Sequence, residues 1–344
     1  MRRELPKLQM PMLSAVCLVV LTSMVLTQGC TKSSETNSPK KSNSPTTAEN
    51  RISVVVTTGM VGDLVRHVAG DYANVVGLMG EGVDPHLFRP TSSDIGTLMK
   101  ADLIIYSGLM LEGPMQPQFE LARRKGRTVT AVADGLPKSQ VRYPAGLEDH
   151  PDPHIWGDVG TWAMSLDHVV QILSEFDPKH ADEYAANANA YRAKLMEVHE
   201  YAKSAIATIP EEQRYLVTAH DAFGYFSTAY EIPVKSVQGI STESEPGVQD
   251  INELVDFLVR NKVPAIFVES TVNAANIQAV VEGAKQQNWN VKIGGTLYSD
   301  SLGAPGTYEG TYIGMMDSNV TTIVKALGGK VPEKGLHGKL SLKK

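Results

Sequence analysis

Apolar residues between positions 51 and 132 occur in short runs whose spacing alternates between that of strands and that of helices. The β-branched run at 52–57 predicts a buried strand, and residues 60–68 carry apolar side chains at helical spacing. Further strands are predicted at 75–79, 103–106 and 129–132, and helices at 95–101, 116–124 and 162–176. Strands that alternate with helices indicate βαβ units and a parallel sheet. We therefore expect an α/β lobe over residues 51–176.

The alternation resumes after residue 210. Strands are predicted at 215–219, 234–237, 265–268 and 291–297, and helices at 223–230, 248–261, 274–287 and 308–327. A second α/β lobe is therefore expected over residues 211–330, followed by a basic tail at 331–344.

The segment 177–210 has a different pattern. No glycine or proline lies between Pro178 and Pro210, and the less polar side chains follow steps of four and three residues. They are Tyr184, Ala188, Tyr191, Leu195, Val198, Ala202, Ala205 and Ile209. The spacing predicts one helix over 178–209, with Asp177 as its N-cap and Pro178 in the first helical position.

Either a coiled-coil dimer or a strut between the two lobes would bury this stripe. The stripe is half alanine and tyrosine and ends after about four heptads, which favours the strut. We expect a monomer of the α/β class, with two lobes, each a mostly parallel β-sheet flanked by helices, joined by one long α-helix. Helices without glycine or proline resist sharp bending, so we expect no wide opening of the lobes about this connection.

The first fifty residues have the pattern of an export and anchoring segment. Basic residues precede an apolar run at 12–26, which is shorter than the about 20 residues that a spanning helix needs. The run ends at Gly29-Cys30, which resembles a bacterial lipobox, although the leucine lies one position too far from Cys30. An uncleaved anchor and ordinary signal cleavage are the alternatives. Residues 31–50 are polar and predict a flexible tether, so we expect an exported domain held at a membrane by a lipid on Cys30.

Composition excludes some classes of protein. The 344 residues carry a net charge of −6 and 6% aromatic residues, so neither the charge nor a stacking surface indicates nucleic-acid binding. The chain has two cysteines, and Cys17 lies in the predicted signal peptide, so no intramolecular disulfide is expected.

Two of the nine histidines share an unusual context. His86 and His154 each end the tripeptide Asp-Pro-His in a loop. Proline fixes its own φ and restricts the preceding residue, so the imidazole is presented from a stiff bend, as a metal ligand requires. The other histidines carry weaker signals: His180 and His199 are expected on the solvated side of the long helix, and His337 in the basic tail.

His220 and Asp300 come from the second predicted lobe. Each follows directly after a predicted strand, and ligands of open parallel sheets bind outside the carboxyl ends of the strands. Three imidazoles and one carboxylate form a set suited to zinc, and to manganese with less preference.

The sequence resembles the metal receptors of bacterial ABC importers for zinc or manganese, in the subclass whose lobes are joined by a rigid helix. The resemblance covers about residues 51–330 and rests on four motifs in order. These are Val83-Asp84-Pro85-His86, Asp152-Pro153-His154-Ile155-Trp156, Thr218-Ala219-His220-Asp221-Ala222-Phe223-Gly224-Tyr225-Phe226 and Leu297-Tyr298-Ser299-Asp300-Ser301.

The resemblance implies that His86, His154, His220 and Asp300 bind the transported ion. It also implies a separate membrane permease and, through it, an ATPase as partners. Histidine at the third position is associated with zinc, or with both metals. Many zinc members carry a His-rich insert before the second ligand, whereas residues 135–153 contain only His150, so manganese stays open.

Two other functions are compatible with such a ligand set. A zinc hydrolase usually has three protein ligands and an open position for water, so four ligands favour a receptor that is not an enzyme. A surface adhesin, a role ascribed to some relatives, is the other alternative. Glu243, Glu245 and Glu269 are candidates for orienting a histidine, but we expect solvated or capping roles for them.

Overall fold

The computed structural model describes residues 51–144 and 146–341. The predicted signal peptide, with Cys30, and the predicted tether lie outside the described residues. No helix in the described part of the chain has both the length and the apolar character that a membrane crossing requires.

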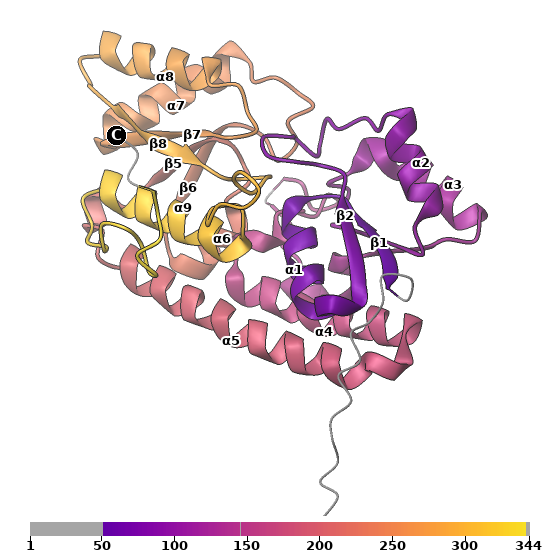
Figure 1. Cartoon of the computed structure of the whole chain (residues 1–344). Helices are drawn as coiled ribbons and strands as arrows, with labels where there is room; N and C mark the ends of the chain where they lie inside the picture. The colour runs from indigo at the N-terminus through magenta and orange to yellow at the C-terminus, as the bar shows by residue number, and fades with distance from the viewer. Residues whose placement is uncertain (1–50, 145, 342–344) are drawn as a thin grey trace, which may run out of the picture. The chain divides into compact units, whose positions relative to one another are not determined.

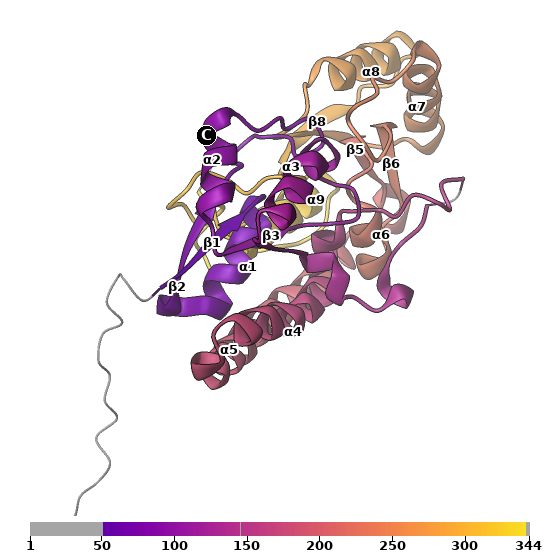
Figure 2. The same ribbon diagram turned by 90° about the vertical axis from the view of Figure 1, so that its right-hand side faces the viewer.

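The first lobe is built on four parallel strands in the order β2-β1-β3-β4, of which β1, β2 and β3 are labelled in Figure 2. The strands are β1 (Ile52–Val56), β2 (Ala73–Gly77), β3 (Leu103–Tyr106) and β4 (Thr128–Ala131), and the helices are α1 (Gly59–Ala69), α2 (Ser92–Lys100), α3 (Gln116–Arg124) and α4 (Val159–Phe176). Alternate residues of β1 point to opposite faces: Val54 and Val56 pack with α1, and Val55 packs with α2 and α3. This two-sided burial explains the continuous β-branched run in the sequence.

The second lobe repeats this layering. Parallel pairs β5-β6 and β7-β8 lie side by side, with β5 next to β7. The elements are β5 (Leu216–His220), α6 (Gly224–Tyr230), β6 (Val234–Gln238), α7 (Val248–Asn261), β7 (Ala265–Glu269), α8 (Ala275–Gln286), β8 (Lys292–Leu297) and α9 (Tyr312–Ala326). Helices α7 and α8 pack on one face and α9 on the other.

The long helix α5 (Ala181–Ile206) packs against both lobes along the same stripe that the sequence predicts (Figure 1). The residues of this stripe are buried, and α5 contacts α1 and α4 as well as α9. Asn187 donates to the carbonyl of Val68 at 3.0 Å, and Tyr201 shares a hydrogen bond with Thr321 at 3.1 Å. Because this stripe is buried within the chain, it is not available for a coiled-coil partner.

The start of α5 differs from the prediction. Pro178–His180 form a 3₁₀ turn, and the α-helix begins only at Ala181. The carboxylate of Asp177 does not cap a backbone N–H; its Oδ2 accepts from His180 Nδ1 at 2.6 Å and from Tyr184 at 3.2 Å. The side-chain partners therefore compete successfully with the predicted N-cap.

The last helix begins later than predicted, and the tail packs against the fold. Helix α9 begins at Tyr312 rather than at residue 308, because Thr311 caps it by accepting from the N–H of Gly314 at 3.0 Å. In the basic tail, the N–H of Leu336 donates to Asp317 at 2.9 Å, and Leu340 is buried. The described part of the tail therefore packs on the second lobe.

The packing of α5 predicts how far the lobes move when ligand binds. Bending α5 would break backbone hydrogen bonds and unpack side chains from both lobes, so we expect no large hinge opening. Solution scattering of the metal-free and the zinc-loaded protein should give nearly the same radius of gyration. A difference of several ångströms would contradict this expectation.

Candidate metal centre

The four residues singled out by the sequence lie at the ends of strands or in the loops that follow them. His86 lies between β2 and α2, and His154 lies in the segment between β4 and α4. His220 is the last residue of β5, and Asp300 follows β8. The carboxyl ends of both sets of parallel strands therefore supply the cluster, as expected for open α/β sheets.

The structure brings all four side chains together. One ligand atom from each of His86, His154, His220 and Asp300 lies within 4.8 Å of the others. The Nε2 atoms of His86 and His154 are 3.3 Å apart. The carboxylate of Asp300 lies between the rings, with Oδ2 3.1 Å from His220 Nε2 and Oδ1 3.4 Å from His154 Nε2.

Burial and hydrogen bonding indicate that this cluster is built to hold a cation. His154 and His220 have no exposed surface, and Asp300 and His86 are 1% and 4% exposed. Apart from contacts within the cluster, His220 Nε2 and both oxygens of Asp300 have no hydrogen-bond partner among the described residues. Buried polar atoms without partners are costly, and one ion between the three nitrogens and the carboxylate would satisfy them together. The donor set suits zinc or manganese.

Asp152 orients the second histidine. Its Oδ1 accepts from the ring Nδ1 of His154 at 2.8 Å and from the backbone N–H of His154 at 3.0 Å. The aspartate of the Asp-Pro-His tripeptide therefore fixes both the turn and the ring, which directs Nε2 toward the cluster. The sequence identified the proline restraint but not this contact.

Glu269 orients the third histidine, which corrects the expectation of a solvated or capping role. The glutamate is 4% exposed, and its Oε2 lies 2.5 Å from Nδ1 of His220. Its other oxygen accepts from the N–H groups of Ala219 and His220 at 2.8 and 2.9 Å. Glu243 and Glu245 are exposed, as expected. The signal that could have identified Glu269 is its place at the end of a strand next to the strand that carries His220.

Contacts between the lobes hold the other two cluster residues. Asp84 accepts from the N–H of His86 at 2.9 Å and from the hydroxyl of Thr242 in the second lobe at 2.6 Å. On the opposite side, Trp156 of the first lobe donates to the carbonyl of Ser299, next to Asp300, at 2.7 Å. The geometry of the cluster therefore depends on the contacts that hold the two lobes together.

The remaining histidines do not join the cluster. His180 stacks on Tyr72 with ring centroids 3.8 Å apart, and His199 lies beside Tyr230. Both are half-buried, so the expectation that they lie on the solvated side of the long helix was wrong. The reason is that Tyr72, which follows α1, covers His180, and that Tyr230 of α6 and Asp158 before α4 lie against His199.

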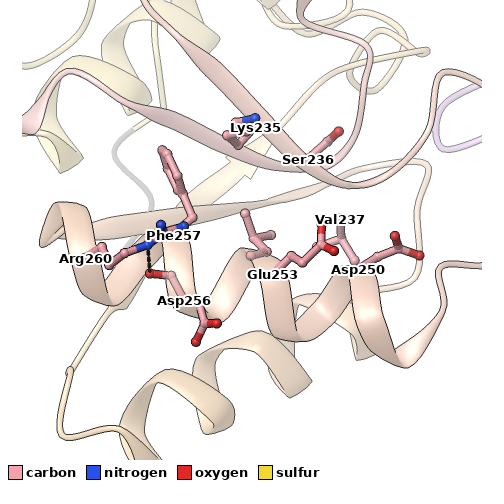
Figure 3. A pocket seen from close by; sticks show the side chains of 9 residues that line it. Lys235, Ser236, Val237, Asp250, Glu253, Asp256, Phe257 and Arg260 are labelled. Carbon is pink, nitrogen blue, oxygen red and sulfur yellow. Dashed lines mark hydrogen bonds between the residues drawn. The ribbon is translucent and has the colours of Figure 1, made fainter. Parts of the chain in front are cut away.

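One hollow leads to the cluster. His86 lines a hollow of about 410 Å³ together with apolar residues of both lobes, among them Met110, Leu147 and Ile240. A separate hollow of about 390 Å³ lies between β6 and α7, and Lys235, Asp250 and Glu253 are among the residues that line it (Figure 3). None of the four cluster residues lines this second hollow.

The pKa of each of these cluster residues depends on burial and on the charges of its neighbours. Burial lowers the pKa of His86 to about 4, so this ring is neutral at neutral pH. Burial alone would lower the pKa of His220, but the carboxylates of Glu269 and Asp300 raise it well above its usual value. Burial would raise the pKa of Asp300, but the charge of His220 and the neighbouring imidazoles hold it below its usual range.

These shifts predict that metal binding releases a proton. Without metal, His220 keeps its proton at neutral pH between two carboxylates, and an ion must displace that proton to reach Nε2. The apparent zinc affinity should therefore fall as pH falls, and further below about pH 4, where His86 also becomes protonated. Calorimetry at neutral pH in buffers of different ionisation enthalpy should show release of about one proton. Equal binding enthalpies in all buffers would contradict this.

Comparison with known proteins identifies the family of this chain. Residues 54–326 match the family model described as the periplasmic component A of the zinc-uptake complex. The chain is 43% identical over 280 residues to the manganese-binding lipoprotein MntA of Bacillus subtilis, covering 81% of this chain and 91% of MntA. It is 31% identical over 286 residues to the metal ABC transporter substrate-binding lipoprotein SloC of Streptococcus mutans, covering 82% of this chain and 92% of SloC.

A solved structure shares the fold. The zinc-binding protein TroA of Treponema pallidum is 42% identical over 281 residues, covering 81% of this chain and 90% of TroA. Its structure, described as a periplasmic zinc-binding protein, superposes with a TM-score of 0.78 over 80% of this chain and 99% of the TroA chain. The chain therefore belongs to the family of periplasmic metal-binding components of zinc-uptake complexes.

Proposed function

We propose that this chain is the extracytoplasmic receptor that captures Zn²⁺ or Mn²⁺ and delivers it to the permease of an ABC importer. The observation that carries the proposal is the buried cluster of three imidazoles and one carboxylate, whose unpartnered atoms face one another. His86, His154, His220 and Asp300 are the proposed ligands. The names of the relatives support zinc or manganese as the transported ion, since MntA is named for manganese and TroA for zinc.

The proposed ligands accommodate either metal. With one oxygen of Asp300, the set is the four-coordinate arrangement that zinc prefers. Both oxygens of Asp300 face histidine nitrogens, at 3.1 and 3.4 Å, so the carboxylate can also offer two donors. An additional oxygen suits manganese, which takes more oxygen ligands than zinc.

A zinc hydrolase fits these observations less well. Hydrolysis needs a metal-bound water beside the protein ligands, whereas here four protein side chains face one another in a buried space. Glu269, the nearest further carboxylate described above, is engaged by His220 and two backbone N–H groups. The relatives reported above are named as binding proteins, not as hydrolases.

We also propose a lipid anchor at Cys30 and a monomeric state. MntA and SloC are named as lipoproteins, and the sequence around Cys30 resembles a lipobox. Burial of the α5 stripe within the chain supports a monomer. Cys30→Ser should shift the protein from the membrane fraction to the soluble fraction, and unchanged membrane association would contradict the anchor.

Metal analysis tests the proposed function. Protein purified without added metal, then titrated with Zn²⁺ and Mn²⁺ against a competing chelator, should bind one ion per chain. The zinc-loaded protein should show no turnover of ester, amide or phosphate substrates. Failure to bind either ion would contradict the receptor, and turnover abolished by Asp300→Ala would establish the hydrolase instead.

A further inference from the structure

The segment before His154 carries an arginine that reaches the metal centre through one intermediate side chain. Nη1 of Arg142 donates to Oδ2 of Asp152 at 2.6 Å. The other oxygen of Asp152 accepts from the ring of His154 at 2.8 Å. Arg142 is therefore bound to the carboxylate that orients the ring, although it does not belong to the four-residue cluster.

Three further hydrogen bonds fix Arg142 against Asp152 and against the second lobe. The N–H of Asp152 donates to the carbonyl of Arg142 at 2.9 Å. The hydroxyl of Tyr225, on α6, accepts from the N–H of Arg142 at 2.8 Å and donates to the carbonyl of Asp152 at 3.2 Å. The two ends of the segment are thus tied together and held by a helix of the opposite lobe.

Gly224 provides the space in which the guanidinium lies. A Cβ at this position would be 2.1 Å from Nη1 and 2.4 Å from Cζ of Arg142, and 2.7 Å from Oδ2 of Asp152. Real Cβ atoms do not approach other atoms this closely, so any side chain here would displace the ion pair. The atoms in the way are the far ends of side chains, so the backbone can stay in place.

We propose that Arg142 is a positioning residue that sets metal affinity by holding Asp152 on the ring of His154, and that Gly224 makes this position accessible. The proposal rests on the proposed role of His154 as a ligand. A guanidinium binds a carboxylate in a fixed orientation, which a lysine ammonium does not reproduce. An imidazole whose Nδ1 is held by an oriented carboxylate keeps Nε2 directed at the metal and more basic.

The burial of the three groups shows why an arginine is suited to this position. The side chains of Asp152 and His154 have no exposed surface, whereas that of Arg142 is 31% exposed. A carboxylate buried beside neutral groups alone would be costly, and the guanidinium compensates its charge while remaining hydrated on its outer side. Loss of the guanidinium removes the hydrogen bond to Oδ2 and leaves Asp152 held only through Oδ1, by the backbone N–H and the ring of His154.

Two variants remove the same contact in different ways. Arg142→Met keeps the length of the side chain but removes its donors, and Gly224→Ala keeps the arginine but displaces its guanidinium. We expect each to weaken Zn²⁺ binding by about 10- to 100-fold, the range typical for partners of metal ligands. Arg142→Lys should restore only part of the loss. The matched control is Arg123→Met, which removes an ion pair of 2.7 Å with Glu120 on α3 and should bind Zn²⁺ as the wild type does.

A double-mutant cycle with Asp152→Asn separates positioning from general destabilisation. If Arg142 acts through Asp152, the double variant should bind Zn²⁺ no more weakly than Asp152→Asn alone. Substituted Co²⁺ should also show an altered visible absorption spectrum in Arg142→Met, because the geometry at His154 changes. Additive losses with an unchanged Co²⁺ spectrum would overturn the proposal.

His154→Ala distinguishes a failure of this inference from a failure of the proposed function. If His154→Ala loses zinc but Arg142→Met and Gly224→Ala bind normally, the positioning role is wrong and the receptor stands. If His154→Ala also binds zinc normally, the ligand assignment itself is wrong. Should Arg142→Met fail to fold, Arg142→Lys still tests the role, because it keeps a cation at this position but not the guanidinium geometry, and zinc binding equal to that of the wild type would contradict the proposal.

Discussion

Replacing His154 with alanine is expected to weaken zinc binding by more than the roughly 100-fold that loss of an outer hydrogen-bond partner costs. The variant removes one of four donors from a buried site and leaves Asp152 without its ring partner. Asp300 would then face two imidazoles instead of three. Competition titration with a chelator of known affinity measures the loss directly.

The control for this prediction is His199→Ala. His199 is half-buried, and its neighbours are Tyr230 and Asp158 rather than the cluster. Its loss should leave zinc affinity unchanged even if it lowers the melting temperature. Comparable losses of affinity in the two variants would show that the ligand assignment is wrong.

Bound metal is expected to stabilise the fold strongly. The four donors come from both lobes and exist as a set only in the native state, so binding free energy adds to the free energy of unfolding. At a thousand-fold excess of free metal over the dissociation constant, the gain is about 4 kcal/mol. With an unfolding entropy of about 2.1 cal/mol/K per residue, the roughly 290 folded residues give about 0.6 kcal/mol/K, so the melting temperature should rise by about 6–7 °C.

Thermal melts with and without Zn²⁺, and with Mn²⁺ in a separate series, measure this gain. Mg²⁺ is the matched control, because it favours octahedral oxygen sites and should not bind a site with three imidazoles. Superimposable melts with and without Zn²⁺ and Mn²⁺ would contradict a bound transition metal. An equal rise with Mg²⁺ would indicate a nonspecific effect of divalent cations.

The order and type of the main elements could be predicted from the sequence because the local patterns agree with the tertiary environment. The run at 52–57 is apolar on both faces, and β1 is covered by helices on both faces. The stripe of α5 was correctly predicted because a single helix buries it along its whole length. Its first turn was not, because the acceptor capacity of Asp177 is used by His180 and Tyr184, and only the folded helix brings Tyr184 close.

The proposed ligands could be identified from sequence for a different reason. The tripeptide Asp-Pro-His restricts its own backbone, so His86 and His154 carry a local signal. Glu269 and Arg142, which hold the ring of His220 and the carboxylate of Asp152, carry no local signal of this kind. Glu269 reaches His220 only because β7 lies next to β5, and Arg142 reaches Asp152 only because Gly224 lies beneath it. Contacts of this kind depend on strand order and on packing between the lobes, which a single sequence does not contain.

The spacing of the four cluster residues along the chain bears on when the protein acquires its cargo. His86 and Asp300 lie near opposite ends of the folded region, and the other two lie between them. A chain that crosses a membrane unfolded, with its N-terminus first, holds only part of the donor set until the segment with Asp300 has emerged. A partial set binds far more weakly than the complete one, since metal sites rarely exist before folding. If the chain is exported unfolded, it therefore carries no metal out of the compartment in which it is synthesised, and it is loaded only where folding is completed.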